Sequence, residues 1–214
     1  MERYSNNRAV MGAKTHWESV YTAKALEVVS WYRPHLDTSL ALIERAALNH
    51  SAAIIDVGGG ASTLADDLVR RGYANVTVLD LSETALRAAK ERLGTASALI
   101  LWLTADVCEA DLPLDRYDIW HDRAVFHFLT LPEQRAAYVA RAAVSLKKTG
   151  HLIVSTFGPE GPTRCSGLDT AHYDAAALEA EFGSEFRLVD NQAEWHTTPA
   201  GGKQQFLYCL FERV

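Results

Sequence analysis

The stretch Ile54-Ile55-Asp56-Val57-Gly58-Gly59-Gly60-Ala61-Ser62 decides the fold of this 214-residue chain. An apolar run ends in an acid, three glycines follow, and a helical pattern begins directly after them. This order predicts the first strand-to-helix turn of a doubly wound α/β domain, where a nucleotide-type ligand binds. A dinucleotide fingerprint that starts at Gly58 would need glycine or alanine at position 63, where this chain has Thr63.

Strand-like and helix-like segments alternate after this turn. The predicted strands are 52–57, 76–81, 98–104, 117–121, 150–157, 186–190 and 205–212. The predicted helices are 14–29, 36–48, 61–71, 83–93, 130–146 and 173–182, the fourth capped by Ser82 and ended by Gly94, the fifth opened by a Thr130–Glu133 capping box. The last two strands have no helix between them and should form an antiparallel hairpin. We therefore expect five strand–helix units: a doubly wound, mostly parallel seven-stranded sheet with a C-terminal antiparallel hairpin, preceded by an N-terminal helical arm.

Composition predicts one domain over residues 1–214, with 1–50 as a helical arm or lid and 51–214 as the core, because 48% apolar residues suffice for a full core. The sequence contains no run of 18 apolar residues, so no membrane span is expected. Residues 1–15 are polar, so no secretory signal is expected. The net charge is −6 without basic stripes, which argues against nucleic acid as a partner. Three widely spaced cysteines fit a reduced cytoplasm.

Two patterns carry a resemblance to a known family. Asp-x-Gly-x-Gly at 56–60 resembles motif I of the class I S-adenosylmethionine (SAM) methyltransferases. His16-Trp17-Glu18-Ser19-Val20-Tyr21 resembles the Trp-Asp-x-x-Tyr arm of small bacterial and mitochondrial members. The resemblance covers residues 14–214 and implies a Rossmann-like fold with SAM as cofactor.

The same resemblance implies a cofactor site along the strand ends. It places Asp56 with Gly58 and Gly60 at the methionine end of the cofactor, and Asp106 with Val107 at the adenine. Asp80, followed by Leu81, stands about 20 residues after the glycines, where a carboxylate holds a ribose. Tyr21 should cover the cofactor from the arm, and Asp122 should meet its ammonium group. The resemblance leaves open plain structural roles: a tight turn for the glycines, a helix cap for Asp80 and a surface ion pair for Asp122 with Arg123.

Candidate acceptor residues follow the fourth and fifth predicted strands. Asp122-Arg123-Ala124-Val125-Phe126-His127 resembles the Asp-Lys-Gly-Thr-x-Asp stretch of the lysine methyltransferase branch, with His127 in place of the final acid. We predict His127 as a general base and Arg123 as the partner of an anionic acceptor or of the cofactor carboxylate. Cys165 lies in the Gly/Pro-rich segment 157–168 and is the third candidate, although a lone cysteine is often inert. No metal site is predicted, because His121, His127 and Cys165 are too scattered.

These residues predict an enzyme that transfers a methyl group from SAM to a small-molecule nucleophile, with an anionic or soft oxygen or sulfur acceptor favoured. A protein-lysine methyltransferase is the alternative within the class. A nicotinamide-dependent oxidoreductase and a non-catalytic SAM-binding module are alternatives from other classes. The oligomeric state is not predicted.

Overall fold

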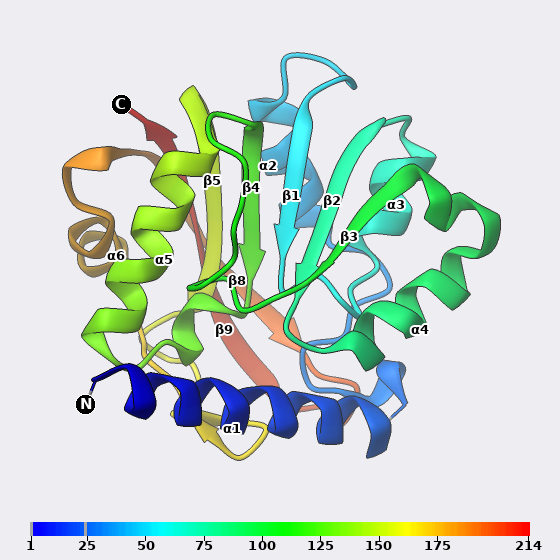
Figure 1. The fold of residues 1–214 in the computed structure, drawn as a ribbon, viewed down its shortest axis with the longest axis vertical. Helices are drawn as coiled ribbons and strands as arrows, with labels where there is room; N and C mark the ends of the chain where they lie inside the picture. The colour runs from blue at the N-terminus through cyan, green and yellow to red at the C-terminus, as the bar shows by residue number, and fades with distance from the viewer. Residues whose placement is uncertain (1, 24) are drawn as a thin grey trace.

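The computed structural model describes residues 2–23 and 25–214, with side chains from residue 12 onward. Within these residues the core is one seven-stranded sheet in the order β3-β2-β1-β4-β5-β9-β8. Its strands are β1 (Ala53–Val57), β2 (Asn75–Asp80), β3 (Ile100–Thr104), β4 (Tyr117–Arg123), β5 (Leu146–Phe157), β8 (Phe186–Thr197) and β9 (Lys203–Arg213). The strands β1 to β5 are parallel, and β9 pairs antiparallel with both β5 and β8. The predicted doubly wound sheet with a terminal hairpin is confirmed (Figure 1).

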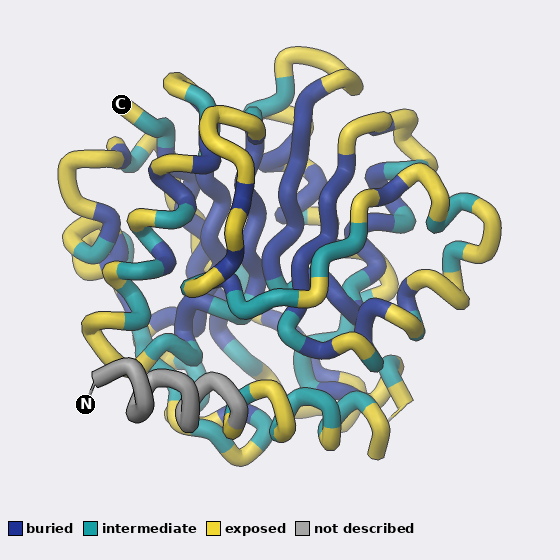
Figure 2. The backbone as a smooth tube through the Cα atoms, viewed as in Figure 1, coloured by how far each residue is buried: buried dark blue, intermediate teal, exposed yellow. Residues whose placement is uncertain are grey.

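Helices cover both faces of the sheet. They are α1 (Glu2–Ala23), α2 (Asp37–Ala46), α3 (Leu64–Arg70), α4 (Glu83–Leu93), α5 (Pro132–Ser145) and α6 (Ala175–Phe182). Successive strand residues point to opposite faces, so Ile54 packs with the residues of α2, α3 and α4, while Ile55 packs with those of α5 and α6. Figure 2 shows the resulting buried sheet beneath exposed loops. No helix among the described residues is long and apolar enough to cross a membrane.

The arm helix α1 lies across the carboxyl ends of the parallel strands (Figure 1). It covers Glu2–Ala23, so the helix predicted at 14–29 begins earlier and ends sooner, and a short 3-10 turn at Leu26–Val28 follows. Glu18 fastens α1 to the start of α4: its carboxylate accepts the Glu83 N–H at 2.7 Å, the Thr84 N–H at 3.2 Å and the Ser82 hydroxyl at 3.1 Å. Partial burial would raise the pKa of Glu18, but these hydrogen bonds lower it. An ionised carboxylate therefore holds the arm over the strand ends.

Several expectations of detail were wrong. The β3–β4 connection contains no helix in the structure, so only four of the five expected strand–helix units form, and Val107, Ala110 and Leu112 fill that part of the core. The helix α5 begins one residue later than a Thr130 cap requires, and the Gln134 side chain, not Glu133, accepts the Leu131 N–H at 3.3 Å. The predicted strand 186–190 continues as β8 to Thr197. A small hairpin of β6 (Arg164–Cys165) and β7 (Leu168–Asp169) was not predicted.

Candidate active site

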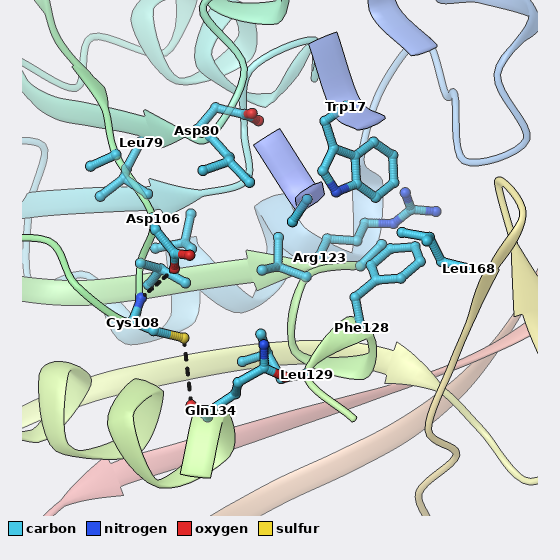
Figure 3. A pocket seen from close by; sticks show the side chains of 18 of the residues that line it. Trp17, Leu79, Asp80, Asp106, Cys108, Arg123, Phe128, Leu129, Gln134 and Leu168 are labelled. Carbon is cyan, nitrogen blue, oxygen red and sulfur yellow. Dashed lines mark hydrogen bonds between the residues drawn. The ribbon is translucent and has the colours of Figure 1, made fainter. Parts of the chain in front are cut away.

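A cavity of about 240 Å³ opens at the carboxyl ends of the parallel strands. Its lining includes Tyr21, Gly58, Asp80, Leu81, Asp106, Val107, Arg123 and Cys165, so the structure brings together eight of the twelve residues predicted for the site. Figure 3 shows Asp80 and Asp106 on one side of this cavity and Arg123, Trp17, Phe128 and Leu168 on the other. A second cavity of about 30 Å³ lies against the glycine loop and also borders Asp56, Tyr21 and Arg123.

Each of the three loop glycines is required by a close contact. A Cβ at Gly58 would lie 2.0 Å from a methyl group of Val125, and the φ of Gly58 is +68°. A Cβ at Gly59 would lie 2.2 Å from Asp56 Oδ2, and one at Gly60 would lie 2.6 Å from Asp80 Oδ2. Such distances are far below van der Waals contact. The loop thus lets backbone pass directly against two carboxylates, which a plain turn does not need.

Asp80, at the end of β2, is held by the backbone on both of its oxygens. Oδ2 accepts the Gly60 N–H at 2.9 Å, and Oδ1 accepts the Ser82 N–H at 2.8 Å. Burial raises the pKa of Asp80 to about 6, against the effect of these two hydrogen bonds. Its carboxylate is therefore fixed in the cavity wall, and each oxygen keeps a second lone pair for a ligand hydroxyl.

Beyond β3, Asp106 and Val107 line the next part of the cavity. Asp106 Oδ1 accepts the Cys108 N–H at 2.8 Å, which closes a tight turn. The Cys108 thiol donates to the Gln134 carbonyl at 3.5 Å, so α5 is tied to this turn (Figure 3). The contribution of Gln134 to the lining was missed, since sequence spacing does not bring α5 to the turn after β3.

Asp56, in β1, is a buried acid with one unused oxygen. Its Oδ1 lies 2.7 Å from His121 Nδ1, and His121 Nε2 lies 2.9 Å from Ser39 Oγ. Its Oδ2 is buried and has no hydrogen-bond partner among the described residues. A buried carboxylate oxygen without a donor is unfavourable by about 1–3 kcal/mol or more, so this atom indicates a place for a ligand donor.

Arg123, the last residue of β4, is buried but incompletely paired. Its Nε donates to the Tyr208 hydroxyl at 3.0 Å and its Nη1 to the Trp31 carbonyl at 2.9 Å. The guanidinium lies 4.5 Å above the Phe206 ring. Its Nη2 is buried without a partner among the described residues, although Arg123 lines both cavities. Tyr208 and Phe206 belong to β9 and were not predicted to lie near the site. The sequence does not show that this antiparallel strand passes the carboxyl ends of the parallel strands.

The structure does not bring Asp122 to either cavity lining. Its carboxylate accepts the Val125 N–H at 2.9 Å, the Phe126 N–H at 3.1 Å and the Tyr138 hydroxyl at 2.7 Å. Burial raises its pKa to about 6. These contacts make Asp122 the anchor of the turn after β4. Asp56 is the better candidate for the predicted contact with the cofactor ammonium.

His127 is also absent from the described cavity lining. Its Nδ1 accepts the Phe157 N–H at 3.1 Å, and its ring stacks on Phe157 at 4.2 Å. Burial, followed by the nearby charge of Arg123, lowers its pKa to about 3. A neutral imidazole that is buried and already accepts a backbone hydrogen bond is poorly placed as a general base, so the contacts of His127 are those of a structural residue.

Four aromatic side chains, called the aromatic wall below, and Cys165 lie on the same side of the main cavity as Arg123. The rings of Trp17, Tyr21, Trp31 and Phe128 meet at centroid distances of 5.1–6.2 Å. Cys165, in β6, lines the main cavity, and its Sγ lies 3.7 Å from Ser30 Oγ. Within the described residues, no group of three or more His, Cys, Asp or Glu could hold a metal ion.

Comparison with known proteins agrees with this geometry. A family model described as a methyltransferase domain matches residues 54–150. An uncharacterised methyltransferase of Mycobacterium tuberculosis is 32% identical over 117 residues, which are 55% of this chain and 56% of that protein. The eEF1A lysine and N-terminal methyltransferase of Mus musculus is 21% identical over 123 residues, 58% of this chain but 17% of the relative. The chain thus spans about a sixth to about half of these relatives' lengths.

Solved structures agree on the fold. The 1,6-didemethyltoxoflavin-N1-methyltransferase of Burkholderia thailandensis, solved with 1,6-didemethyltoxoflavin and S-adenosylhomocysteine, superposes with a TM-score of 0.69 at 20% identity. That match covers 98% of this chain and 90% of the other. The strand order and this superposition show that the chain has a Rossmann-like fold of the kind found in SAM-dependent methyltransferases, and residues 54–150 match the methyltransferase-domain model.

Proposed function

We propose that this chain transfers a methyl group from SAM to a small-molecule acceptor that is an anion or a soft nucleophile. The observation that carries the proposal is Arg123, a cavity-lining residue whose buried guanidinium has one nitrogen, Nη2, without a partner among the described residues. A buried cationic donor without a partner favours a ligand that brings a carboxylate, phenolate, thiolate or oxyanion.

The residues present fit the cofactor of the family. Asp80 would hold the ribose hydroxyls, Asp106 with Val107 would face the adenine, and the unpaired Asp56 Oδ2 would accept from the ammonium group. The three glycines leave the backbone room to approach, since a Cβ at each position would collide with a neighbour. When bound, the cofactor supplies an electrophilic methyl group on a sulfonium, which the aromatic wall suits through cation–π attraction.

Sheet order separates the cofactor side of the cavity from the acceptor side. Among the described lining residues, Asp80 is the last residue of β2, and Asp106 and Glu109 lie in the connection after β3. Arg123, Phe157 and Phe206 come from β4, β5 and β9, at the other side of β1, and Cys165 comes from β6 of the separate small hairpin. The acceptor therefore meets one cation, one thiol and apolar rings.

This surrounding favours acceptors that need no general base. His127 is buried beside the cavity with a pKa lowered to about 3, so it cannot take a proton from an acceptor in neutral solution. An acceptor that arrives ionised, such as a thiolate or carboxylate, needs only to be oriented and desolvated before attack on the methyl carbon. Arg123 performs the orientation and the arm helix α1 excludes water.

A protein-lysine acceptor is the second candidate. Its support is the Trp17-Glu18-x-x-Tyr21 arm and the lysine methyltransferase named among the relatives. Lysine must lose its proton before it attacks, and a neighbouring arginine repels the ammonium form. Because Arg123 lines the cavity and a guanidinium attracts an anion but not an ammonium group, the small anionic acceptor is favoured.

A methyl-transfer screen tests the proposal. Purified protein with isotopically labelled SAM is offered thiols, phenols, carboxylates, oxyanions and lysine-containing proteins. We expect transfer to a small anionic or sulfur acceptor, and Arg123→Gln should raise the acceptor KM at least about tenfold while S-adenosylhomocysteine affinity changes little. Arg187→Gln, at an exposed arginine of β8, is the control. Transfer to proteins alone would overturn the proposal, and an equal loss of cofactor affinity in Arg123→Gln would assign Arg123 to the cofactor carboxylate.

A further inference from the structure

A line of three buried polar side chains leads from α2 to the glycine loop. Ser39 of α2, His121 of β4 and Asp56 of β1 are 0%, 1% and 2% exposed. Ser39 Oγ lies 2.9 Å from His121 Nε2, and His121 Nδ1 lies 2.7 Å from Asp56 Oδ1. A carboxylate can only accept, so Nδ1 donates in that bond, and Nε2 pairs with the Ser39 hydroxyl, which can either donate or accept.

The two oxygens of Asp56 thus differ in their hydrogen-bond partners. Oδ1 is fixed by His121, while Oδ2 is buried without a partner among the described residues, and Asp56 borders the small cavity beside the glycine loop. Gly59 makes room for Oδ2, because a Cβ there would lie 2.2 Å from it. A hydrogen bond to one oxygen fixes the rotation of the carboxylate, and therefore fixes the direction of the other.

We infer that His121, supported by Ser39, is a positioning residue that aims Asp56 Oδ2 at the ammonium group of the cofactor. The inference rests on the proposed function, since it needs SAM in the cavity. It adds His121, which is not among the site residues predicted from the sequence. Because Ser39 belongs to α2, which follows the arm segment, the docking of that helix also takes part in shaping the cofactor site.

Two amide variants separate the two nitrogen atoms of the imidazole. The amide nitrogen of asparagine can replace Nδ1, and that of glutamine can replace Nε2. His121→Asn therefore keeps the donor to Asp56 and loses the contact with Ser39, whereas His121→Gln does the reverse. Both variants place a polar amide in the same buried site, so each controls for the effect of the other on folding.

The assay is calorimetry with two ligands. S-adenosylhomocysteine carries the ammonium group, and 5′-methylthioadenosine lacks the amino-acid end altogether. We expect His121→Gln to weaken S-adenosylhomocysteine about tenfold and to leave 5′-methylthioadenosine within about twofold, with His121→Asn near the wild type for both. His151→Gln, on the neighbouring strand β5, should change neither affinity.

The outcomes are distinct. An equal loss for both ligands in His121→Gln would mean that His121 only supports the fold, and no loss for either would mean that Asp56 needs no positioning; each result overturns the inference while the proposed function stands. Wild-type protein that binds neither ligand would overturn both. In an Asp56→Asn background, His121→Gln should cause no further loss of S-adenosylhomocysteine affinity, and a further tenfold loss there would also contradict the inference.

Discussion

Replacing Asp80 with asparagine should make the free protein more stable above pH 6 and weaken its hold on the cofactor. Burial raises the pKa of Asp80 from 3.8 to about 6. The folded protein therefore binds this proton more tightly than the unfolded chain does. The stability that Asp80 contributes is complete below pH 3.8 and is lost as the pH rises through about 6.

The size of the effect follows from the shift in pKa. A shift of about two units, at about 1.4 kcal/mol for each, removes about 3 kcal/mol of stability once Asp80 is ionised in the folded state. The amide of asparagine cannot accept from both Gly60 and Ser82, so one hydrogen bond of about 1 kcal/mol is lost. The net gain for Asp80→Asn is about 2 kcal/mol at pH 8. Most of this gain disappears by pH 5, where the buried acid is already largely protonated.

Urea denaturation of both proteins at pH 5 and pH 8 measures this difference, and calorimetry with S-adenosylhomocysteine at pH 8 measures the functional loss. Asp118→Asn is the matched control. Burial would raise the pKa of Asp118, but its hydrogen bonds with Lys147 and the Ala53 N–H lower it. Asp118→Asn should therefore reduce stability at pH 8, with a smaller loss at low pH. An Asp80→Asn protein that is less stable than the wild type at both pH values would refute the reasoning.

Three further changes test other parts of the site. Gly60→Ala should lower stability by about 1–3 kcal/mol, because the new methyl group would lie 2.6 Å from Asp80 Oδ2; thermal melting in the absence of cofactor measures this, and an unchanged Tm would contradict it. Ala124→Gly should raise stability by about 1 kcal/mol, since the φ of Ala124 is +73°; a lower urea midpoint would show that this conformation is not strained. Glu18→Gln should loosen the arm and speed amide hydrogen exchange in α1 beyond its first turns, with Glu27→Gln as control. Equal exchange rates in the two variants would show that Glu18 does not hold the arm in place.

The sequence correctly predicts that Asp80 and Asp106 come together, because both residues lie at or just after the ends of neighbouring parallel strands. Parallel strands end at one edge of the sheet, so an acid directly after each strand lies near the same cavity. Asp80 and Asp106 follow this rule, and both line the cavity. Ser82 and Gly94 mark the ends of α4 by local chemistry, and the structure confirms both: Ser82 Oγ accepts the Ala85 N–H at 3.1 Å, and the φ of Gly94 is +58°.

Features that depend on pairing rather than on local pattern are harder to predict. The strand β8 lies at the edge of the sheet and is largely exposed from Val189 to Glu194, so its polar sequence carries little strand signal. Its length follows from the partner strand β9, which pairs with it from Phe186 to Thr197. The small hairpin at Arg164–Cys165 is likewise visible only once the chain is folded, although it brings Cys165 to the cavity.

The turn after β4 decides which of its residues face the cavity. Residues 122–127 lie together in sequence, and spacing alone gives each of them the same claim on the site. Ala124 adopts a left-handed conformation and donates its N–H to Ser155 at 2.9 Å, which bends the chain sharply at the strand end. Arg123, before the bend, keeps its place in the cavity wall, whereas His127, after it, turns under Phe157. A base predicted from position in this segment therefore depends on the conformation of the turn, and the place of Arg123 in the lining, where His127 is absent, supports the proposal that Arg123 orients the acceptor.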